Sequence, residues 1–315
     1  MLLAVVLLYV GAVLGVNGIW LIGTARAAAA APAPAAAGAG GAGAGDGGGD
    51  LQSRFAIPFP TAVIASLLGI DADRRDDFRH WSEQMVLGVF EPTTPEQQAE
   101  IARSGEQMGE WLDELVEERA GNRGEDLVSV LLRAELEGGA LTSDEMRGFV
   151  ITLLVAGSIT TAYLIGSAVV EMAADPSLLA LARHNNAVIG RIAEETLRYE
   201  APVQLMFRTA TTAVELAGVT IPRGATVLAL IGSANRDEKV FVNPDRFDPN
   251  RANVGEHIGF GHGVHFCLGA ALARIEARIA IEELLAVAPG LEITGDVTQM
   301  TSLVFRGPTA VPLRL

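Results

Sequence analysis

The chain's only cysteine lies in a glycine-rich segment, Phe260 to Gly269, which opens directly onto an apolar pattern with helical spacing. That pattern predicts a helix over residues 270–285 and rests on Leu272, Ile275, Ile279 and Leu284. Cys267 therefore stands at a helix start, where backbone N–H groups and the positive helix end favour a thiolate over a thiol. Glycines let such a loop lie against a bulky planar group, so the sulfur is suited to bind ferric haem axially.

The residues around this cysteine resemble the haem-binding signature of the cytochrome P-450 family, F-x-x-G-x-x-x-C-x-G. The match is made by Phe260, Gly263, Cys267 and Gly269. The resemblance implies haem b (iron protoporphyrin IX) as the cofactor, Cys267 as the axial ligand of the haem iron, and Phe260 as a side chain packed near the sulfur. The alternative is a buried structural cysteine, which would be the better interpretation of a cysteine without the motif.

Three more residues are assigned to the cofactor by the same resemblance. His265, two positions before the cysteine, is implied to contact a haem propionate, and Gly261 belongs to the loop that lies against the haem. Arg208 matches the position from which the family sends a strand arginine to a propionate. An ordinary solvated arginine is the alternative for Arg208. A nucleophilic Cys267 paired with His262 or His265 is a further alternative, but the sequence shows no third orienting group nearby.

The charge balance argues against nucleic acid as a partner. With 23 basic and 38 acidic residues the net charge is -15, whereas phosphate binding needs a basic face. Hydrophobic residues make up 50% of the 315 residues, which is enough for a sizeable core. A single cysteine forbids an intrachain disulfide and is typical of a reducing, cytoplasmic setting for the main domain.

The chain begins with an uncharged run, residues 2–23, that is long enough to cross a hydrocarbon core as a helix. We predict a transmembrane helix over 1–26 that tethers the following domain to the inner membrane, with Arg26 favouring its cytoplasmic side. A secretory signal is the alternative, but its positive n-region is missing. Residues 27–50 are almost wholly Ala, Gly and Pro, which predicts a flexible linker.

From residue 51 the apolar spacing is mainly helical and then changes to short β-branched runs separated by Gly and Pro. The clearest helices are predicted over 73–86, 94–118 and 126–135. The predicted fold class is mainly α with small β sheets. Residues 51–315 resemble a partial cytochrome P-450 haem domain that lacks the N-terminal third of the family's fold, so we expect apolar surface to be exposed on the remaining helices.

Glu195 and Arg198 stand three residues apart on a predicted helix that ends before Pro202, so their side chains share one face. Alone, such a pair would be a surface ion pair of little energetic weight. Upstream of the cysteine motif and followed by Arg246, it resembles the family's buried Glu-Arg-Arg triad. The implied role of Glu195, Arg198 and Arg246 is structural, because removing one member would leave a buried charge unpaired.

Residues 148–170 carry no charge and by length alone resemble a second membrane helix. Hydroxyl groups interrupt this apolar run, and the Ala156-Gly157 pair weakens a helix without a packing gain. Both features favour instead a central helix that another group approaches closely. The stretch Ala156–Thr161 resembles the family's oxygen-binding motif, A-G-x-(acid)-T-T. The resemblance implies that Ala156 and Gly157 open a groove and that Thr160 supplies a hydroxyl on the oxygen side of the haem.

Ile159 occupies the position of the acid in that motif. An isoleucine cannot relay protons, so proton delivery would depend on Thr160, Ser158 or water, and we expect slow or uncoupled oxygenation. A reaction that uses peroxide directly depends less on this proton relay.

These features predict a haem-thiolate monooxygenase that activates dioxygen and oxidises a small apolar substrate. The resemblance implies a ferredoxin/ferredoxin reductase or a similar flavoprotein as electron donor. Arg274 and Arg278, four residues apart, are a candidate docking pair for that donor. Two alternatives stay open: a truncated, non-catalytic fragment that retains haem poorly, and a peroxide-driven haem-thiolate enzyme.

Overall fold

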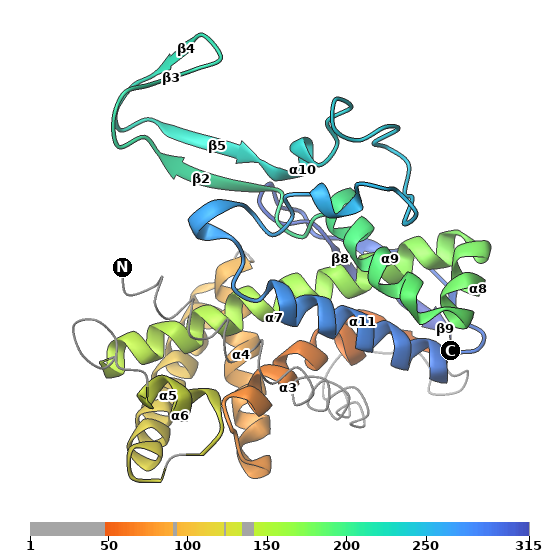
Figure 1. The fold of residues 1–315 in the computed structure, drawn as a ribbon. Coiled ribbons are helices and arrows are strands. Elements are labelled where there is room, and N and C mark those ends of the chain that lie inside the picture. The colour runs from red at the N-terminus through yellow and green to blue at the C-terminus, as the bar shows by residue number, and fades with distance from the viewer. Residues whose placement is uncertain (1–47, 91–92, 123, 134–141, 315) are drawn as a thin grey trace.

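The computed structural model describes residues 48–90, 93–122, 124–133 and 142–314, and helices make up most of this part (Figure 1). The predicted transmembrane helix (1–26) and the linker as far as residue 47 lie outside the described residues. The helices are η1 (Gln52–Ala56), α3 (Pro58–Leu67), η2 (Ala72–Arg74), α4 (Arg75–Phe90), α5 (Pro95–Gly121), α6 (Leu127–Arg133), α7 (Ser143–Ala174), α8 (Pro176–His184), α9 (Asn186–Tyr199), α10 (Ile231–Ala234), η3 (Val254–Glu256), η4 (Gly263–His265) and α11 (Ala270–Val287).

The strands are short, and they form four small sheets within the described residues. They are β1 (Gly48–Asp50), β2 (Leu205–Thr209), β3 (Val214–Leu216), β4 (Val219–Ile221), β5 (Thr226–Leu230), β6 (Glu292–Ile293), β7 (Thr298–Gln299), β8 (Pro308–Ala310) and β9 (Pro312–Arg314). Strand order is β1-β9-β6 in one sheet, with antiparallel pairs β2-β5, β3-β4 and β7-β8. The predicted class, mainly α with small β sheets, is confirmed.

Helix α7 runs through the middle of the molecule (Figure 1). Its start is fixed by a capping box, in which the Thr142 hydroxyl accepts from the Glu145 N–H and the Glu145 carboxylate accepts from the Thr142 N–H. Among the described residues only α7 is long and apolar enough to cross a membrane, but it packs against α3, α4, α9 and α11. The prediction of a central core helix over 148–170 is therefore confirmed.

Two apolar clusters meet along α7. The first half of the helix packs with α3, α4, α5 and α6 around Phe78, Trp111 and Leu154. The second half packs with α3, α9 and α11 around Ile165 and Ile279. Since the helix has apolar partners on both halves, it serves as the common wall of the core.

The predicted linker extends three residues too far. Gly48–Asp50 form strand β1, which pairs with β9 so that Gly48 lies opposite Arg314. The Asp50 carboxylate also accepts hydrogen bonds from the Ser53 and Val311 N–H groups. The prediction of a flexible linker as far as Asp50 is therefore wrong for these last three residues.

Exposed apolar side chains gather on strands rather than on the helices where they were expected. The β2-β5 pair and the β3-β4 hairpin extend away from the helical body (Figure 1). Ala217 and Gly218, both with positive φ (51° and 81°), form the tight turn of the hairpin. On β2 and β5 the exposed large apolar residues are Met206, Phe207, Leu228 and Leu230.

Candidate functional site

Cys267 lies on an exposed loop that the backbone itself closes. The Cys267 N–H donates to the Phe260 carbonyl (2.8 Å), and the Phe266 N–H donates to the Gly263 carbonyl (3.0 Å). Gly261 and Gly263 have φ values of 74° and 70°, which a side chain would strain. The loop leads into α11, and it therefore holds the sulfur at a helix start, as the sequence predicted.

The pKa of the Cys267 thiol is raised, not lowered. Although the residue is exposed, nearby protein atoms desolvate the sulfur and raise its pKa, while the Gly269 N–H and the charge of Arg274 act in the opposite direction. The expectation that the helix start alone yields a thiolate is therefore wrong for the polypeptide by itself. Metal binding removes the thiol proton, so a metal ligand does not need a low pKa beforehand.

Two contacts place the cysteine loop beside the middle of α7. Leu268 packs against the apolar cluster that contains Leu154, and Glu276 on α11 forms a hydrogen bond with Thr161. Leu154 lies just before the predicted oxygen-binding stretch, Ala156–Thr161, and Thr161 is the last residue of that stretch. The structure thus brings this stretch and the cysteine loop to the same part of the molecule (Figure 1).

Within that stretch the side chains differ in burial. Ala156 is exposed and Thr160 partly exposed, whereas Ser158 and Ile159 are buried. The Thr160 hydroxyl donates to the Ala156 carbonyl (2.6 Å), so it can accept a second hydrogen bond from outside the helix. Ala156 and Thr160 are therefore accessible on α7, and their roles on the oxygen side of the haem stay predictions.

Gly157 lies where α7 packs on α3. A Cβ atom at this position would lie 3.2 Å from the Ile64 Cδ1 atom of α3, which is tighter than ordinary van der Waals contact. The glycine therefore allows α3 to pack closely on α7. Its predicted role of opening a groove for the cofactor stays a prediction.

Glu276 is a buried acid that the sequence analysis missed. Its side chain is 2% exposed, and Oε1 has no hydrogen-bond partner. Burial raises the pKa of Glu276 well above its usual range, while the hydrogen bond with Thr161 acts in the opposite direction. A signal was available, because Leu272, Glu276 and Ala280 recur every four residues and share one helix face.

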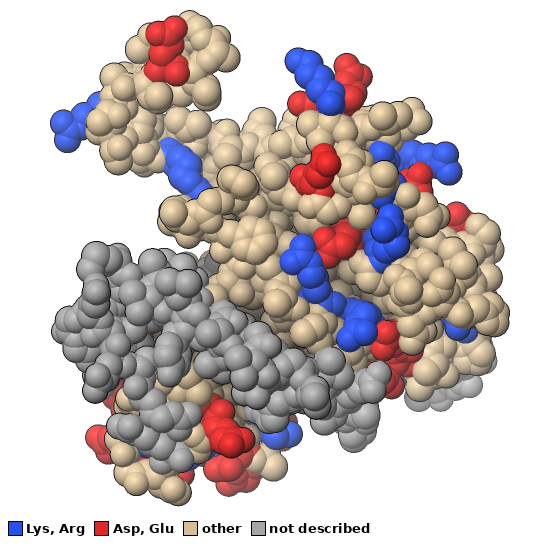
Figure 2. All heavy atoms as spheres, in the orientation of Figure 1, with Lys and Arg blue, Asp and Glu red and all other residues tan. Residues whose placement is uncertain are grey.

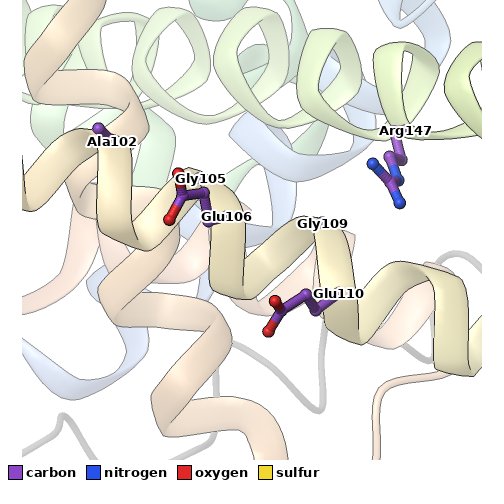
Figure 3. A pocket seen from close by; sticks show the side chains of 6 residues that line it. All are labelled: Ala102, Gly105, Glu106, Gly109, Glu110 and Arg147. Atoms are coloured by element: carbon purple, nitrogen blue, oxygen red, sulfur yellow. The ribbon is translucent and has the colours of Figure 1, made fainter.

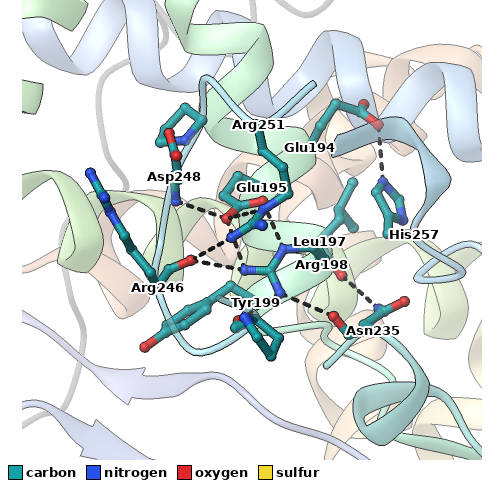
Figure 4. A network of polar contacts seen from close by, with 12 residues as sticks. Glu194, Glu195, Leu197, Arg198, Tyr199, Asn235, Arg246, Asp248, Arg251 and His257 are labelled. Carbon is teal, nitrogen blue, oxygen red and sulfur yellow. Dashed lines mark hydrogen bonds and ion pairs between the residues drawn. The ribbon is translucent and has the colours of Figure 1, made fainter. Parts of the chain in front are cut away.

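Glu195 and Arg198 form a completely buried pair on α9 (Figure 4). Arg198 Nε lies 2.8 Å from Glu195 Oε2, and Arg198 Nη2 lies 2.8 Å from Oε1. The remaining Arg198 N–H groups donate to the carbonyls of Asn235 (3.0 Å), Pro244 (2.8 Å) and Arg246 (3.1 Å). The predicted pair thus ties α9 to the segment that precedes the cysteine loop.

The third arginine of the cluster is Arg251, not Arg246. Arg251 Nε lies 3.5 Å from Glu195 Oε1, and its side chain is 7% exposed. The Arg246 side chain is exposed and points away from the network in Figure 4, but its carbonyl oxygen accepts from Arg198 and from Arg251 (3.0 Å). The physical reason is a turn at Asn243, whose φ is 49°, that directs the Arg246 backbone inward.

This correction yields a stability prediction. Replacing Arg251 by alanine should lower the free energy of unfolding by about 3 kcal/mol, because it removes the positive charge beside Glu195 and leaves the carbonyls of Val242, Asn243 and Arg246 short of donors. Replacing Arg246 by alanine keeps the carbonyl and should cost less than about 0.5 kcal/mol. Urea unfolding of both variants measures the difference. Equal losses would contradict the assignment.

The predicted cofactor contacts lie on two elements. Phe260, Gly261, His265 and Cys267 share one loop, with the Phe260 and Phe266 ring centroids 6.3 Å apart and His265 exposed on the turn η4. Arg208 is exposed on β2, and its Nη1 donates to the Phe207 carbonyl (2.8 Å). The structure therefore brings the loop residues together, while the propionate roles of His265 and Arg208 stay predictions.

Arg274 and Arg278, the candidate donor-docking pair, both have acidic partners. Arg274 Nε lies 2.5 Å from Glu194 Oε1, and Arg278 Nη1 lies 4.0 Å from Glu282 Oε1. Figure 2 shows acidic and basic side chains interspersed on the face that carries α11. The docking role stays a prediction, and it depends on two arginines whose charges are already paired.

The hollow drawn in Figure 3 belongs to a different part of the surface. It is lined by Ala102, Gly105, Glu106, Gly109, Glu110 and Arg147. Arg147 lies two helical turns before Leu154 on α7, and its Nε donates to Asp113 Oδ1 (2.8 Å). This hollow therefore has no direct connection with the chemistry of the cysteine loop.

Comparison with known proteins decides the family. A model of the family described as Cytochrome P450 matches residues 85–286. The chain belongs to the cytochrome P450 family. Cytochrome P450 107B1 of Saccharopolyspora erythraea is 42% identical over 269 residues, which cover 84% of this chain and 64% of that protein. The 6-deoxyerythronolide B hydroxylase of the same organism is 38% identical over 270 residues, covering 84% and 65%.

A solved P450 structure agrees with this assignment. CYP109E1 from Bacillus megaterium in complex with testosterone superposes with a TM-score of 0.80 at 32% identity, covering 85% of this chain and 73% of that one. The chain spans just under two thirds of the length of the two P450 relatives above.

P450 proteins bind haem b, and the residues present here fit that group. The ligand atom is the sulfur of a thiol, a soft ligand that binds haem iron in this family. The cysteine that carries it is exposed. At positions 261 and 263 φ is positive and the residues are glycines, so the loop carries no side chain at these two positions. Cys267 is thus the residue that would hold the iron.

Proposed function

We propose that this chain forms the haem-binding part of a P450 monooxygenase and oxidises a small apolar substrate with electrons from a separate donor such as ferredoxin and its reductase. The observation that carries the proposal is that the exposed Cys267 loop lies in the same part of the molecule as the accessible Ala156 and Thr160 of α7. When bound, haem supplies the redox chemistry that activates dioxygen. A cytoplasmic position, with residues 1–26 as a tether, is part of the proposal.

The chain's own residues contribute in distinct ways. Cys267 offers an electron-rich sulfur, and the Phe260 carbonyl fixes the peptide N–H of that residue. Ala156 leaves space on α7, and the Thr160 hydroxyl presents an acceptor there. The names of two P450 neighbours, a 6-deoxyerythronolide B hydroxylase and a testosterone complex, support a predominantly apolar substrate.

The test is the spectrum of the purified chain after reduction and addition of carbon monoxide. A long-wavelength Soret band supports haem held by a thiolate. Failure to bind haem favours the alternative of a non-catalytic fragment.

A peroxide-driven reaction is the second candidate, and Ile159 is the observation that favours it. Its side chain is 7% exposed and packs in the core at the position where the motif carries an acid. Such an enzyme would form product with hydrogen peroxide and no reductase. Absence of turnover under that condition would remove this candidate.

Replacing Ile159 by glutamate should raise reductase-supported turnover about tenfold or more, because a carboxyl group at this place supplies a proton donor that isoleucine lacks. Turnover per bound haem is the measurement, since burying a carboxyl group also costs stability. Ile159→Gln is the matched control, being similar in size and polar but not acidic. Equal turnover in the two variants would show that proton delivery through this position is not limiting.

A further inference from the structure

Glu194 joins three separate elements next to the cysteine loop. It lies on α9, directly before the triad residue Glu195. Its Oε2 lies 3.0 Å from His257 Nε2, and its two oxygens accept from Arg274 Nε (2.5 Å) and Nη2 (3.1 Å) on α11. Figure 4 shows Glu194 reaching towards His257. One carboxylate thus connects α9, the loop before the cysteine and the helix after it.

The proton on His257 is directed towards this carboxylate. The Gly259 N–H donates to His257 Nδ1 (3.1 Å), so Nδ1 acts as an acceptor and Nε2 carries the hydrogen. The loop also packs directly on α9 here, because a Cβ at Gly259 would lie 2.8 Å from the Leu197 carbonyl oxygen. His257 is therefore held from both sides of its ring.

The partners of Glu194 hold Phe260 as well. The Arg274 guanidinium lies over the Phe260 ring, 4.6 Å from its centroid, and the His257 ring centroid is 6.0 Å from the same ring. The Phe260 carbonyl in turn accepts from the Cys267 N–H (2.8 Å). A chain of direct contacts therefore leads from Glu194 through Arg274 and Phe260 to the peptide of the cysteine.

Charge and burial make Glu194 the centre of this arrangement. Its side chain is 19% exposed, while that of Arg274 is 40% exposed. Burial opposes the charge of Glu194, but hydrogen bonds from His257 and Arg274 lower the pKa of Glu194 to about 2. The carboxylate is ionised at neutral pH and needs both donors.

We propose that Glu194 is a positioning residue that fixes the Cys267 loop through His257, Arg274 and Phe260, and thereby controls the bond between the sulfur and the haem iron. This inference rests on the proposed function, in which Cys267 is the iron ligand. The side-chain contacts of Glu194 are with His257 and Arg274. It acts by fixing the direction of the cysteine peptide between two helices.

The test is Glu194→Gln in the full chain. A glutamine is neutral and has one acceptor oxygen in place of two, so it loses the charge and cannot reproduce all three hydrogen bonds that the Glu194 oxygens accept from His257 and Arg274. Exchange of the Cys267 amide hydrogen should become about tenfold faster, because a charge-assisted hydrogen bond is lost. In the reduced, carbon-monoxide-bound protein, part of the long-wavelength Soret band should move to shorter wavelength, and the reduction potential of the haem should change.

Glu292→Gln is the matched control. Glu292 is an exposed carboxylate on β6 that pairs with Arg314, so the same chemical change is made at a distant ion pair. In the Glu292→Gln protein we expect the exchange rate of the Cys267 amide, the carbon monoxide spectrum and the haem reduction potential to equal those of the parent. If Glu194→Gln behaves like this control in all three measurements, the inference is wrong.

A second variant covers the case in which Glu194→Gln does not fold. Arg274→Lys keeps the positive charge on a partly exposed side chain but loses the two-pronged contact and the stacking on Phe260. It should give a smaller change of the same kind, and an unchanged Cys267 amide would contradict the inference. If the parent chain shows no thiolate spectrum, the proposed function fails, whereas amide exchange still decides whether Glu194 holds the loop.

Discussion

Replacing Cys267 by serine is expected to abolish the long-wavelength Soret band and to weaken haem retention by about 100-fold or more. A serine hydroxyl stays protonated at neutral pH and is a poor ligand for haem iron, whereas a thiol loses its proton on binding metal. The fold should be unaffected, because the side chain is exposed and the hydrogen bond from this residue to Phe260 uses the backbone. The measurements are the carbon monoxide spectrum, haem titration and far-UV circular dichroism.

Val264→Ser is the control for this experiment. It introduces the same hydroxyl group into the same loop, at a side chain that is 85% exposed and therefore makes few packing contacts. Its haem affinity and spectrum should match those of the parent. If the Cys267→Ser protein binds the pigment as firmly as the control and with the same colour, Cys267 is not the iron ligand.

The features that the sequence predicted well are those encoded within a few residues. The cysteine loop depends on glycines at fixed positions, and two of them have the positive φ values that only glycine adopts easily. The last helix follows from helical spacing, and the same spacing places Glu195 and Arg198 on one face, whereas their burial was implied by the family resemblance. The core position of α7 followed from polar groups and glycine within an uncharged stretch.

The features that the sequence missed depend on contacts between distant segments. Arg246 and Arg251 are five residues apart in one irregular segment, and only the path of the backbone decides which side chain reaches Glu195. Strand β1 exists because Gly48 pairs with Arg314 at the other end of the chain. Neither fact leaves a local pattern that spacing could detect.

Two acids that are withdrawn from solvent, the buried Glu276 and the partly buried Glu194, were also not predicted. Glu194 and Glu276 lie in helices where a glutamate is ordinarily a solvated surface residue. Glu194 is drawn in by His257 and Arg274, and Glu276 is buried where α11 meets α7. Helical spacing can place an acid on an apolar face, but only the packing of other segments against that face shows that the acid is shielded from solvent.

Replacing Arg198 by alanine is expected to prevent stable folding. The variant removes all five hydrogen bonds of the guanidinium and leaves Glu195 as a buried charge. Breaking such a pair costs about 3–5 kcal/mol, a large part of the roughly 5–15 kcal/mol by which domains are stable. Urea unfolding should show a much lower midpoint, or the protein should be insoluble. An exposed arginine, Arg314→Ala, should change the midpoint little.

A double variant shows whether Glu195 and Arg198 stabilise only each other or also hold the backbone of the neighbouring segment. Where a buried pair is self-contained, replacing both partners by apolar residues is often neutral or stabilising. Here Arg198 also donates to the carbonyls of Asn235, Pro244 and Arg246, and Glu195 accepts from the Asp248 N–H. Glu195→Leu combined with Arg198→Met leaves those groups unpaired, so it should remain about 2–4 kcal/mol less stable than the parent. Full recovery in the double variant would show that the pair stabilises only itself and does not hold the segment leading to Cys267.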